Sequence, residues 1–296
     1  MKVQANGIPI EVEDTGEADR PAVLLVMGLG MQLIAWPEPF VQGLQAAGFR
    51  VLRFDNRDAG LSQHFPQLGV PNLLLASLKH RLGLRVRAPY TLQAMAADSL
   101  GVLAALGIRA AHVVGVSMGG MIAQRMALAA PESVLSLTSI MSSSGARRLP
   151  GPKPQVLKLL LGRPTGPGED AQVEHTLRLL RAIGSPAFPA DEDQVRQRVR
   201  AAVRRSSDPP GVLRQMVAVA ADGTRARELA GLRVPTLVVH GKDDPLVPFA
   251  CGHDTARRIR GARLVAIAGM GHDLPPGVVD LLLQAVVPHL RQTGGR

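Results

Sequence analysis

A serine flanked by glycines stands near the middle of the sequence. Residues 115–120 read G-V-S-M-G-G; they follow an apolar run that predicts a strand, and they open a helical pattern. In this strand–turn–helix context the motif G-x-S-x-G puts a nucleophile on a sharp turn, where glycines at positions 115 and 119 avoid collisions. The start of the helix would aim amide groups at the reacting centre, so the Met118 N–H is a candidate oxyanion donor. We therefore predict that Ser117 is a nucleophile.

A serine hydroxyl needs a base, and the base needs a group that orients it. Two later segments supply suitable residues. A predicted strand at 236–239 runs into H-G-K-D-D at 240–244, and a predicted strand at 264–267 runs into A-G-M-G-H at 268–272. Carboxyl ends of parallel strands meet at one edge of a sheet, so these side chains are expected near Ser117. His272 is the candidate base, and Asp244 or Asp243 is its candidate partner.

The elements that must position these residues follow from the hydrophobic pattern. Short β-branched runs alternate with helical patterns, which is typical of a mostly parallel sheet covered by helices. Helices are predicted at Phe40–Ala47, Leu92–Leu106, Met118–Ala130 and Gly277–Leu290. An N-G hairpin turn joins the first two strands. The eight predicted strands are Lys2–Gln4, Ile8–Glu13, Val23–Met27, Arg50–Asp55, His112–Val116, Val134–Met141, Thr236–Val239 and Leu264–Ile267.

Two stretches break the alternation. Residues 142–227 are rich in Pro, Gly and Arg, with helical pieces near 172–183, 193–205 and 212–220. We interpret this stretch as a helical cap inserted into a core of residues 1–141 and 228–296. The second stretch, His64–Tyr90, contains the segment Leu73–Leu84, which carries a helical stripe of leucines at 74, 75, 78 and 82. We expect the stripe to pack against the cap and wall an apolar substrate site. Completion of the core and association with a membrane surface are the alternatives.

Composition excludes several classes of protein. With 46% hydrophobic and 20% charged residues the chain is a folded one, and no apolar run approaches the ~20 residues of a membrane span. The polar first residues and the lone Cys251 favour a cytoplasmic protein without disulfides, and we expect no stable membrane insertion. The net charge is +10, but no nucleic-acid module is recognisable and aromatic residues make up only 3%. We therefore expect no nucleic-acid partner. The histidines are scattered and no phosphate-binding glycine motif occurs, so we also expect no metal and no cofactor. Oligomeric state is not indicated.

These motifs resemble those of the α/β-hydrolases, most closely the aclacinomycin methylesterase-type branch. The Ser, Asp, His order along the chain is the family's order. The resemblance implies an α/β-hydrolase fold with an eight-stranded, mostly parallel sheet and a helical cap. It also implies that Asp244, rather than Asp243, is the catalytic carboxylate and that the Leu29 amide is the second oxyanion donor. The matching stretches are L-L-V-M-G (24–28), W-P (36–37), R-F-D-N-R-D-A-G-L-S (53–62), H-V-V-G-V-S-M-G (112–119), V-P-T-L through D-P (234–245) and G-M-G-H (269–272).

The activity implied by the resemblance is that of a cofactor-free serine hydrolase, a carboxylesterase acting on a small to medium apolar ester. Ser117, His272 and Asp244 would form the triad, and the amides of Leu29 and Met118 the oxyanion hole. Two alternatives stay open at this point. The same triad could hydrolyse a C–C bond or run a perhydrolase reaction. The scaffold could also serve as a catalytically silent ligand-binding protein, which would leave the strained serine turn without a use.

Overall fold

Eight strands form one sheet in the part of the chain that the computed structural model describes, residues 1–293. They are β1 (Lys2–Ala5), β2 (Ile8–Asp14), β3 (Ala22–Val26), β4 (Arg50–Phe54), β5 (Ala111–Val116), β6 (Val134–Ile140), β7 (Thr236–Gly241) and β8 (Arg263–Ile267). Their order across the sheet is β1-β2-β4-β3-β5-β6-β7-β8. The pairs β1/β2 and β2/β4 are antiparallel, and all the others are parallel. The predicted eight-stranded, mostly parallel sheet is confirmed.

The central strands are apolar because both of their faces are covered. Every residue of β3 and of β5 is buried. Successive side chains of a strand point to opposite faces, so in β3 Val23 and Leu25 pack into one apolar core while Leu24 and Val26 pack into the other. This double burial is why these strands read as continuous apolar runs instead of alternating patterns.

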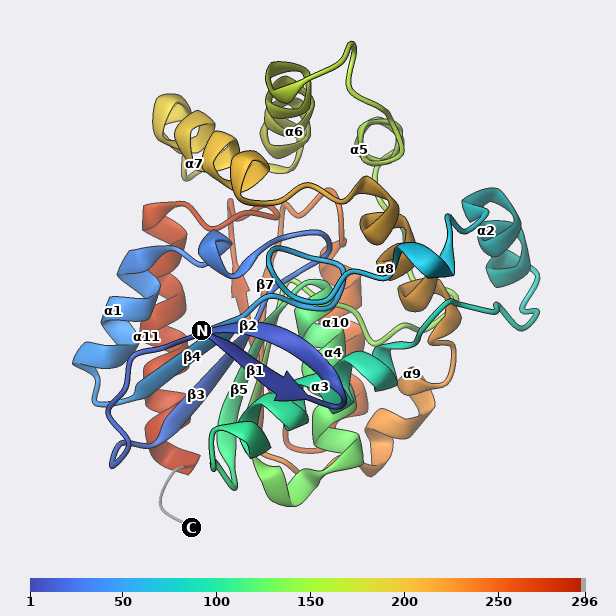
Figure 1. Cartoon of the computed structure of the whole chain (residues 1–296). Coiled ribbons are helices and arrows are strands. Elements are labelled where there is room, and N and C mark those ends of the chain that lie inside the picture. Colours follow the sequence, from blue (N-terminus) through green and yellow to red (C-terminus); the bar gives the residue numbers. More distant parts are fainter. Residues whose placement is uncertain (294–296) are drawn as a thin grey trace.

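Helices cover the two faces of the sheet (Figure 1). One face carries α1 (Glu38–Ala46) and α11 (Pro276–Thr293), and the other carries α3 (Leu92–Ala105), α4 (Met118–Ala129) and α10 (Phe249–Arg258). Helix α10 is absent from the elements predicted from the sequence. Among residues 1–293, no helix combines the length and the apolar character that a membrane crossing requires. Short 3-10 turns lie at Leu33–Ala35, Pro66–Leu68, Pro131–Ser133 and Leu229–Gly231.

Four helices of the inserted stretch lie over one end of the sheet, with α6 and α7 uppermost in Figure 1. They are α5 (Pro154–Leu160), α6 (Glu169–Ile183), α7 (Glu192–Arg205) and α8 (Pro209–Ala221), and the short α9 (Arg225–Glu228) follows them. Val173 and Leu177 of α6 pack with Val199 of α7 in a small separate apolar cluster. We propose residues 142–227 as the extent of the cap, because this range begins after β6 and contains α5 to α8.

The leucine stripe lies on α2 (Leu73–Arg81) and just beyond it, and its predicted packing is wrong. Its four leucines, at 74, 75, 78 and 82, are 82%, 49%, 56% and 64% exposed. Helix α2 instead packs on α8 through its opposite face. There Ala76 is buried and the ring Nδ1 of His80 donates to the carbonyl of Ala220 at 3.0 Å. Because this polar contact fixes which face of the helix turns inward, the leucines face solvent.

Replacing Leu74 and Leu78 together with glutamine should leave both stability and substrate preference nearly unchanged. Exposed positions of this kind change the free energy of unfolding by about 0.5 kcal/mol or less each, and glutamine keeps good helix propensity. The measurement is Tm together with kcat/KM for acetate and octanoate esters. Leu177→Gln, at a buried position of α6, is the control that should lower Tm. A change in chain-length preference of the double variant would show that α2 contacts the substrate after all.

Candidate active site

Ser117 lies on a strained turn between β5 and α4. Its backbone has φ 56° and ψ −120°, a conformation that non-glycine residues rarely adopt. A Cβ at position 115 would come within 2.2 Å of the Gly119 carbonyl oxygen, and one at position 119 within 2.0 Å of the Val26 carbonyl oxygen. Both flanking glycines are therefore required by close backbone contacts, as the motif predicts. The Ser142 hydroxyl donates to the Ser117 carbonyl at 2.7 Å and holds the turn from the end of β6.

His272, in the loop after β8, connects Ser117 to Asp244. Its Nε2 lies 3.0 Å from the Ser117 Oγ, and its Nδ1 lies 2.6 Å from Asp244 Oδ2. A carboxylate only accepts hydrogen bonds, so Nδ1 carries the hydrogen and Nε2 is free to accept the hydroxyl proton. The structure thus brings together three residues that the sequence separates by 127 and 28 positions. This arrangement allows nucleophilic attack by serine with histidine as the base.

Asp244 is held by the turn that follows β7. Its Oδ1 accepts hydrogen bonds from the amides of Leu246 at 2.9 Å and Val247 at 2.8 Å, and the residue is buried. His240 Nε2 donates to the Val247 carbonyl at 2.7 Å and so fixes the far side of the turn. Burial lowers the pKa of His240, which keeps its ring neutral beside the carboxylate. Asp243 points elsewhere and accepts from the Gly269 amide at 2.7 Å.

The loop that carries His272 is fixed by the residues at the end of α6. The His272 amide donates to the Ile183 carbonyl at 2.7 Å, and the Gly271 amide donates to the Ser185 hydroxyl at 2.9 Å. The Ser185 hydroxyl in turn donates to Asp273, whose pKa is raised by burial. Sequence reasoning missed these contacts, because no local pattern signals a carbonyl or a serine that supports a loop nearly 90 residues away.

The loop after β3 lies directly beside Ser117. A Cβ at Gly28 would stand 3.2 Å from the Ser117 Cβ, so glycine permits the close approach. The Met31 amide donates to the Gly28 carbonyl at 3.2 Å and closes a turn around Leu29. Within residues 1–293 the Leu29 amide donates to no protein acceptor, as a donor reserved for a substrate oxygen requires. Met118 begins α4, where amides have no acceptor within the helix.

Asp55 and Arg57, in the loop after β4, hold that loop by hydrogen bonds. Asp55 accepts from the amides of Leu33 at 2.7 Å and Leu61 at 2.8 Å. Arg57 forms two hydrogen bonds of 2.6 Å with the buried Asp98. Their charges are therefore satisfied inside the protein and serve the loop's shape.

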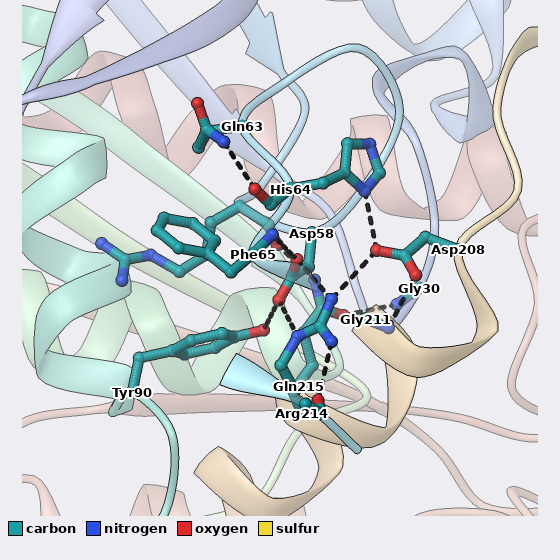
Figure 2. Close-up of polar contacts among 12 residues, drawn as sticks. Gly30, Asp58, Gln63, His64, Phe65, Tyr90, Asp208, Gly211, Arg214 and Gln215 are labelled. Atoms are coloured by element: carbon teal, nitrogen blue, oxygen red, sulfur yellow. Dashed lines mark hydrogen bonds and ion pairs between the residues drawn. The ribbon is translucent and has the colours of Figure 1, made fainter. Parts of the chain in front are cut away.

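A partly buried cluster of charged residues joins this loop to the start of α8 (Figure 2). Asp58, His64 and Asp208 are close enough together to suggest a cation site. However, Arg214 donates to both Asp58 oxygens at 2.8 Å and to Asp208 at 3.1 Å. The Tyr90 hydroxyl donates to Asp58 at 2.7 Å. The positive charge that the carboxylates need is supplied by the guanidinium, so this cluster does not fit a metal ion.

His64 contributes a pH-dependent contact to this cluster. Its Nδ1 lies 2.7 Å from Asp208 Oδ2 and its Nε2 lies 3.0 Å from the Gly60 carbonyl oxygen, so both ring nitrogens face acceptors. Burial alone would lower the pKa of His64, but the hydrogen bonds to Asp208 and Gly60 outweigh it and raise the pKa above 6.5. Only the charged ring can donate both hydrogen bonds.

The stability that His64 contributes should therefore fall as pH rises. A group whose pKa is raised by folding stabilises fully below its unfolded pKa, and that contribution is lost as pH rises through the folded pKa. We expect the Tm difference between the wild type and His64→Gln to shrink from about pH 5.5 to about pH 8.5. Thermal melts across this range provide the measurement. A difference that stays constant with pH would contradict a charged His64.

Comparison with known proteins places this chain in a family. The family model of the alpha/beta hydrolase fold matches residues 21–275. The chain is 32% identical over 295 residues to rhodomycin D methylesterase DauP of Streptomyces sp. (strain C5), covering 93% of this chain and 92% of that protein. The relative DnrP of Streptomyces peucetius, also named a rhodomycin D methylesterase, matches equally well in identity and coverage. In fold, the meta-cleavage product hydrolase CumD of Pseudomonas fluorescens IP01 superposes with a TM-score of 0.74 at 20% identity, covering 99% of this chain and 97% of CumD.

The chain belongs to the alpha/beta hydrolase family. The predicted fold class and the resemblance to aclacinomycin methylesterase-type enzymes are both confirmed. The protein is a serine hydrolase of the esterase type, as the sequence predicts.

Proposed function

We propose that the protein is a carboxylesterase whose nucleophile, base and orienting carboxylate are Ser117, His272 and Asp244. The observation that carries this proposal is the unbroken chain of short contacts from the Ser117 Oγ through both ring nitrogens of His272 to Asp244 Oδ2. The strained backbone at Ser117 supports it, because strain of this kind persists only where the surrounding structure enforces it and clusters at active sites.

The reaction follows from the positions of the donors and acceptors. The Ser117 Oγ attacks the ester carbonyl carbon while its proton passes to His272 Nε2, and Asp244 stabilises the imidazolium that forms. The resulting oxyanion accepts hydrogen bonds from the amides of Leu29 and Met118. His272 then gives the proton to the leaving alcohol, which departs and leaves an acyl-enzyme. A water molecule then attacks the acyl-enzyme while His272 takes its proton. His272 returns that proton to the Ser117 oxygen, which departs and leaves the free acid and the free enzyme.

The two amides of the oxyanion hole account for a large part of the rate enhancement. They belong to backbone that is already ordered, so they need no rearrangement when charge develops on the substrate oxygen. Losing one donor of this kind typically costs about 3 kcal/mol of transition-state stabilisation. Helix α4 is 12 residues long, and the positive end of its dipole lies at Met118, where it also stabilises the oxyanion.

We propose a small-molecule ester of apolar character as the substrate, with methyl esters of larger carboxylic acids as the class to examine first. The support comes from the two relatives named as methylesterases, which match over more than nine-tenths of their length. Methanol is a small leaving group, so the protein would recognise mainly the acid portion of the substrate. The loops and the cap would contact that portion.

The test is a panel of methyl and p-nitrophenyl esters of increasing acyl length, with a β-diketone as the comparison substrate. We expect turnover of esters and little turnover of the diketone. Labelling of Ser117 by a fluorophosphonate probe should accompany activity, because labelling requires an activated serine. Diketone cleavage without ester turnover would favour C–C hydrolysis, and failure of both turnover and labelling would favour a ligand-binding protein.

A further inference from the structure

Gln215 of α8 joins two loops of the active site and is fully buried (Figure 2). Its Oε1 accepts from the Gly30 amide at 2.8 Å, and its Nε2 donates to the Arg57 carbonyl at 2.8 Å. One end of the side-chain amide meets a donor and the other meets an acceptor, so only one orientation satisfies both. The side chain therefore acts as a spacer of fixed length between the loop after β3 and the loop after β4.

The Gly30 amide belongs to the turn that presents Leu29. In this turn the Met31 amide donates to the Gly28 carbonyl, and Gly30 has φ +65°. A positive φ at the third residue is the mark of a type II turn, in which the middle peptide plane is flipped relative to the type I form. The hydrogen bond from the Gly30 amide to Gln215 fixes the direction of that plane. The neighbouring amide, that of Leu29, takes its orientation from the same turn.

The helix that carries Gln215 is rigidly attached to the core. Its neighbour Arg214 is 1% exposed and forms two hydrogen bonds of 2.8 Å with Asp58, so α8 cannot slide along the loop after β4. Val212, one turn earlier, packs so closely that a Cβ at Gly30 would come within 2.8 Å of its Cγ2. Helix α8 thus contacts the turn both by packing and by a hydrogen bond.

We propose that Gln215 is a positioning residue for the oxyanion hole: the cap helix α8 sets the orientation of the turn at 28–31, and with it the Leu29 amide. Gln215 contributes to stabilisation of the tetrahedral intermediate without contacting the substrate. This inference rests on the proposed function, since it assigns a role within the same catalytic site.

The experiment compares Gln215→Leu and Gln215→Glu with the wild type. Leucine removes both hydrogen bonds. We expect kcat to fall by about 10- to 100-fold, which is no more than the effect of losing an oxyanion donor. KM should change by about threefold or less. Inhibition by a trifluoromethyl ketone, which forms a tetrahedral adduct at the active-site serine, should weaken by the same factor as kcat. Glutamate keeps an acceptor for the Gly30 amide but loses the donor to the Arg57 carbonyl, so it should restore part of the lost kcat.

Gln124→Leu is the matched control. Gln124 is also fully buried and has two side-chain partners, Ser139 at 3.1 Å and Arg225 at 2.9 Å, but it makes no hydrogen bond to the turn at 28–31. Gln124→Leu should lower Tm about as much as Gln215→Leu does, but it should keep the wild-type kcat and the wild-type affinity for the ketone. If Gln215→Leu does not fold, Gln215→Asn takes its place, because its shorter side chain cannot span both partners. The kcat of Gln215→Glu is then compared with that of Gln215→Asn.

The outcomes separate this inference from the proposed function. A wild type that turns over no ester overturns the proposed function and the inference with it. An active wild type with unchanged kcat in Gln215→Leu overturns the positioning role alone, as does a fall in kcat that Gln124→Leu reproduces. A proportional loss of kcat and ketone affinity confined to Gln215 variants supports it.

Discussion

Replacing Ser117 with alanine should reduce ester hydrolysis by about 10⁴-fold or more, as deletions of a triad nucleophile do. Among residues 1–293 the Ser117 Oγ has one hydrogen-bond partner, the His272 Nε2. The substitution therefore removes the hydroxyl and leaves no other described side chain without its partner. We expect Tm to change little. The measurement is kcat/KM for p-nitrophenyl acetate together with a thermal melt.

Ser99→Ala provides the matched control for Ser117→Ala. Ser99 is buried in α3, and its hydroxyl donates to the Met95 carbonyl of the same helix at 2.9 Å. This variant should keep full activity. Substantial turnover by a correctly folded Ser117→Ala protein would remove Ser117 from the mechanism.

Asp244→Asn should cost about 10⁴-fold in kcat, because an amide at this position favours the wrong tautomer of the histidine. Asp244 Oδ2 is the acceptor that keeps the hydrogen on His272 Nδ1. With asparagine, the side-chain NH₂ can face that nitrogen, and the hydrogen then moves to Nε2, which can no longer accept the proton of Ser117. Steady-state kinetics across a broad pH range measures the loss.

The neighbouring Asp243→Asn is the control that tests the assignment of this turn. Asp243 accepts from the Gly269 amide at 2.7 Å and forms no hydrogen bond with His272. The oxygen of asparagine can keep that hydrogen bond, so the loss should be no more than about tenfold, equivalent to the weakening of one hydrogen bond. If Asp243→Asn were the more damaging variant, Asp244 would not be the orienting carboxylate.

The cap helices form hydrogen bonds with three loops that surround Ser117. Gln215 of α8 holds the turn at 28–31. Arg205, at the end of α7, donates to Asp55 at 2.7 Å in the loop after β4. The carbonyl at the end of α6 accepts from the amide of His272. The geometry of the groups around Ser117 therefore depends on how the cap helices pack on the core.

Much of the candidate site was predictable from the sequence, because it rests on local rules. A serine between glycines, after an apolar run and before a helical pattern, specifies the turn at Ser117 by sterics alone. The approximate position of His272 followed from a similar rule, since residues just beyond parallel strands gather at one edge of the sheet. The alternation of strands and helices then determined the fold class.

The choice between Asp243 and Asp244 needed the family resemblance or the structure. Adjacent residues in a turn point in different directions, and the pattern of residue types does not state which one faces the histidine. The amides of Leu246 and Val247 decide it, because they draw the carboxylate of Asp244 into the turn and leave its second oxygen to His272.

The orientation of α2 and the role of Gln215 were decided by tertiary structure alone. A leucine stripe predicts a buried face, but helix α2 buries Ala76 instead and binds α8 through His80, so the leucines face outward. Gln215 lies within a helix of ordinary composition, 185 residues from the amide it binds. Local sequence determines which conformations a segment favours, whereas contacts between distant segments depend on how every element packs. The sequence by itself therefore determined the reactive groups and the sheet that gathers them, and only the folded chain decided what holds those groups in place.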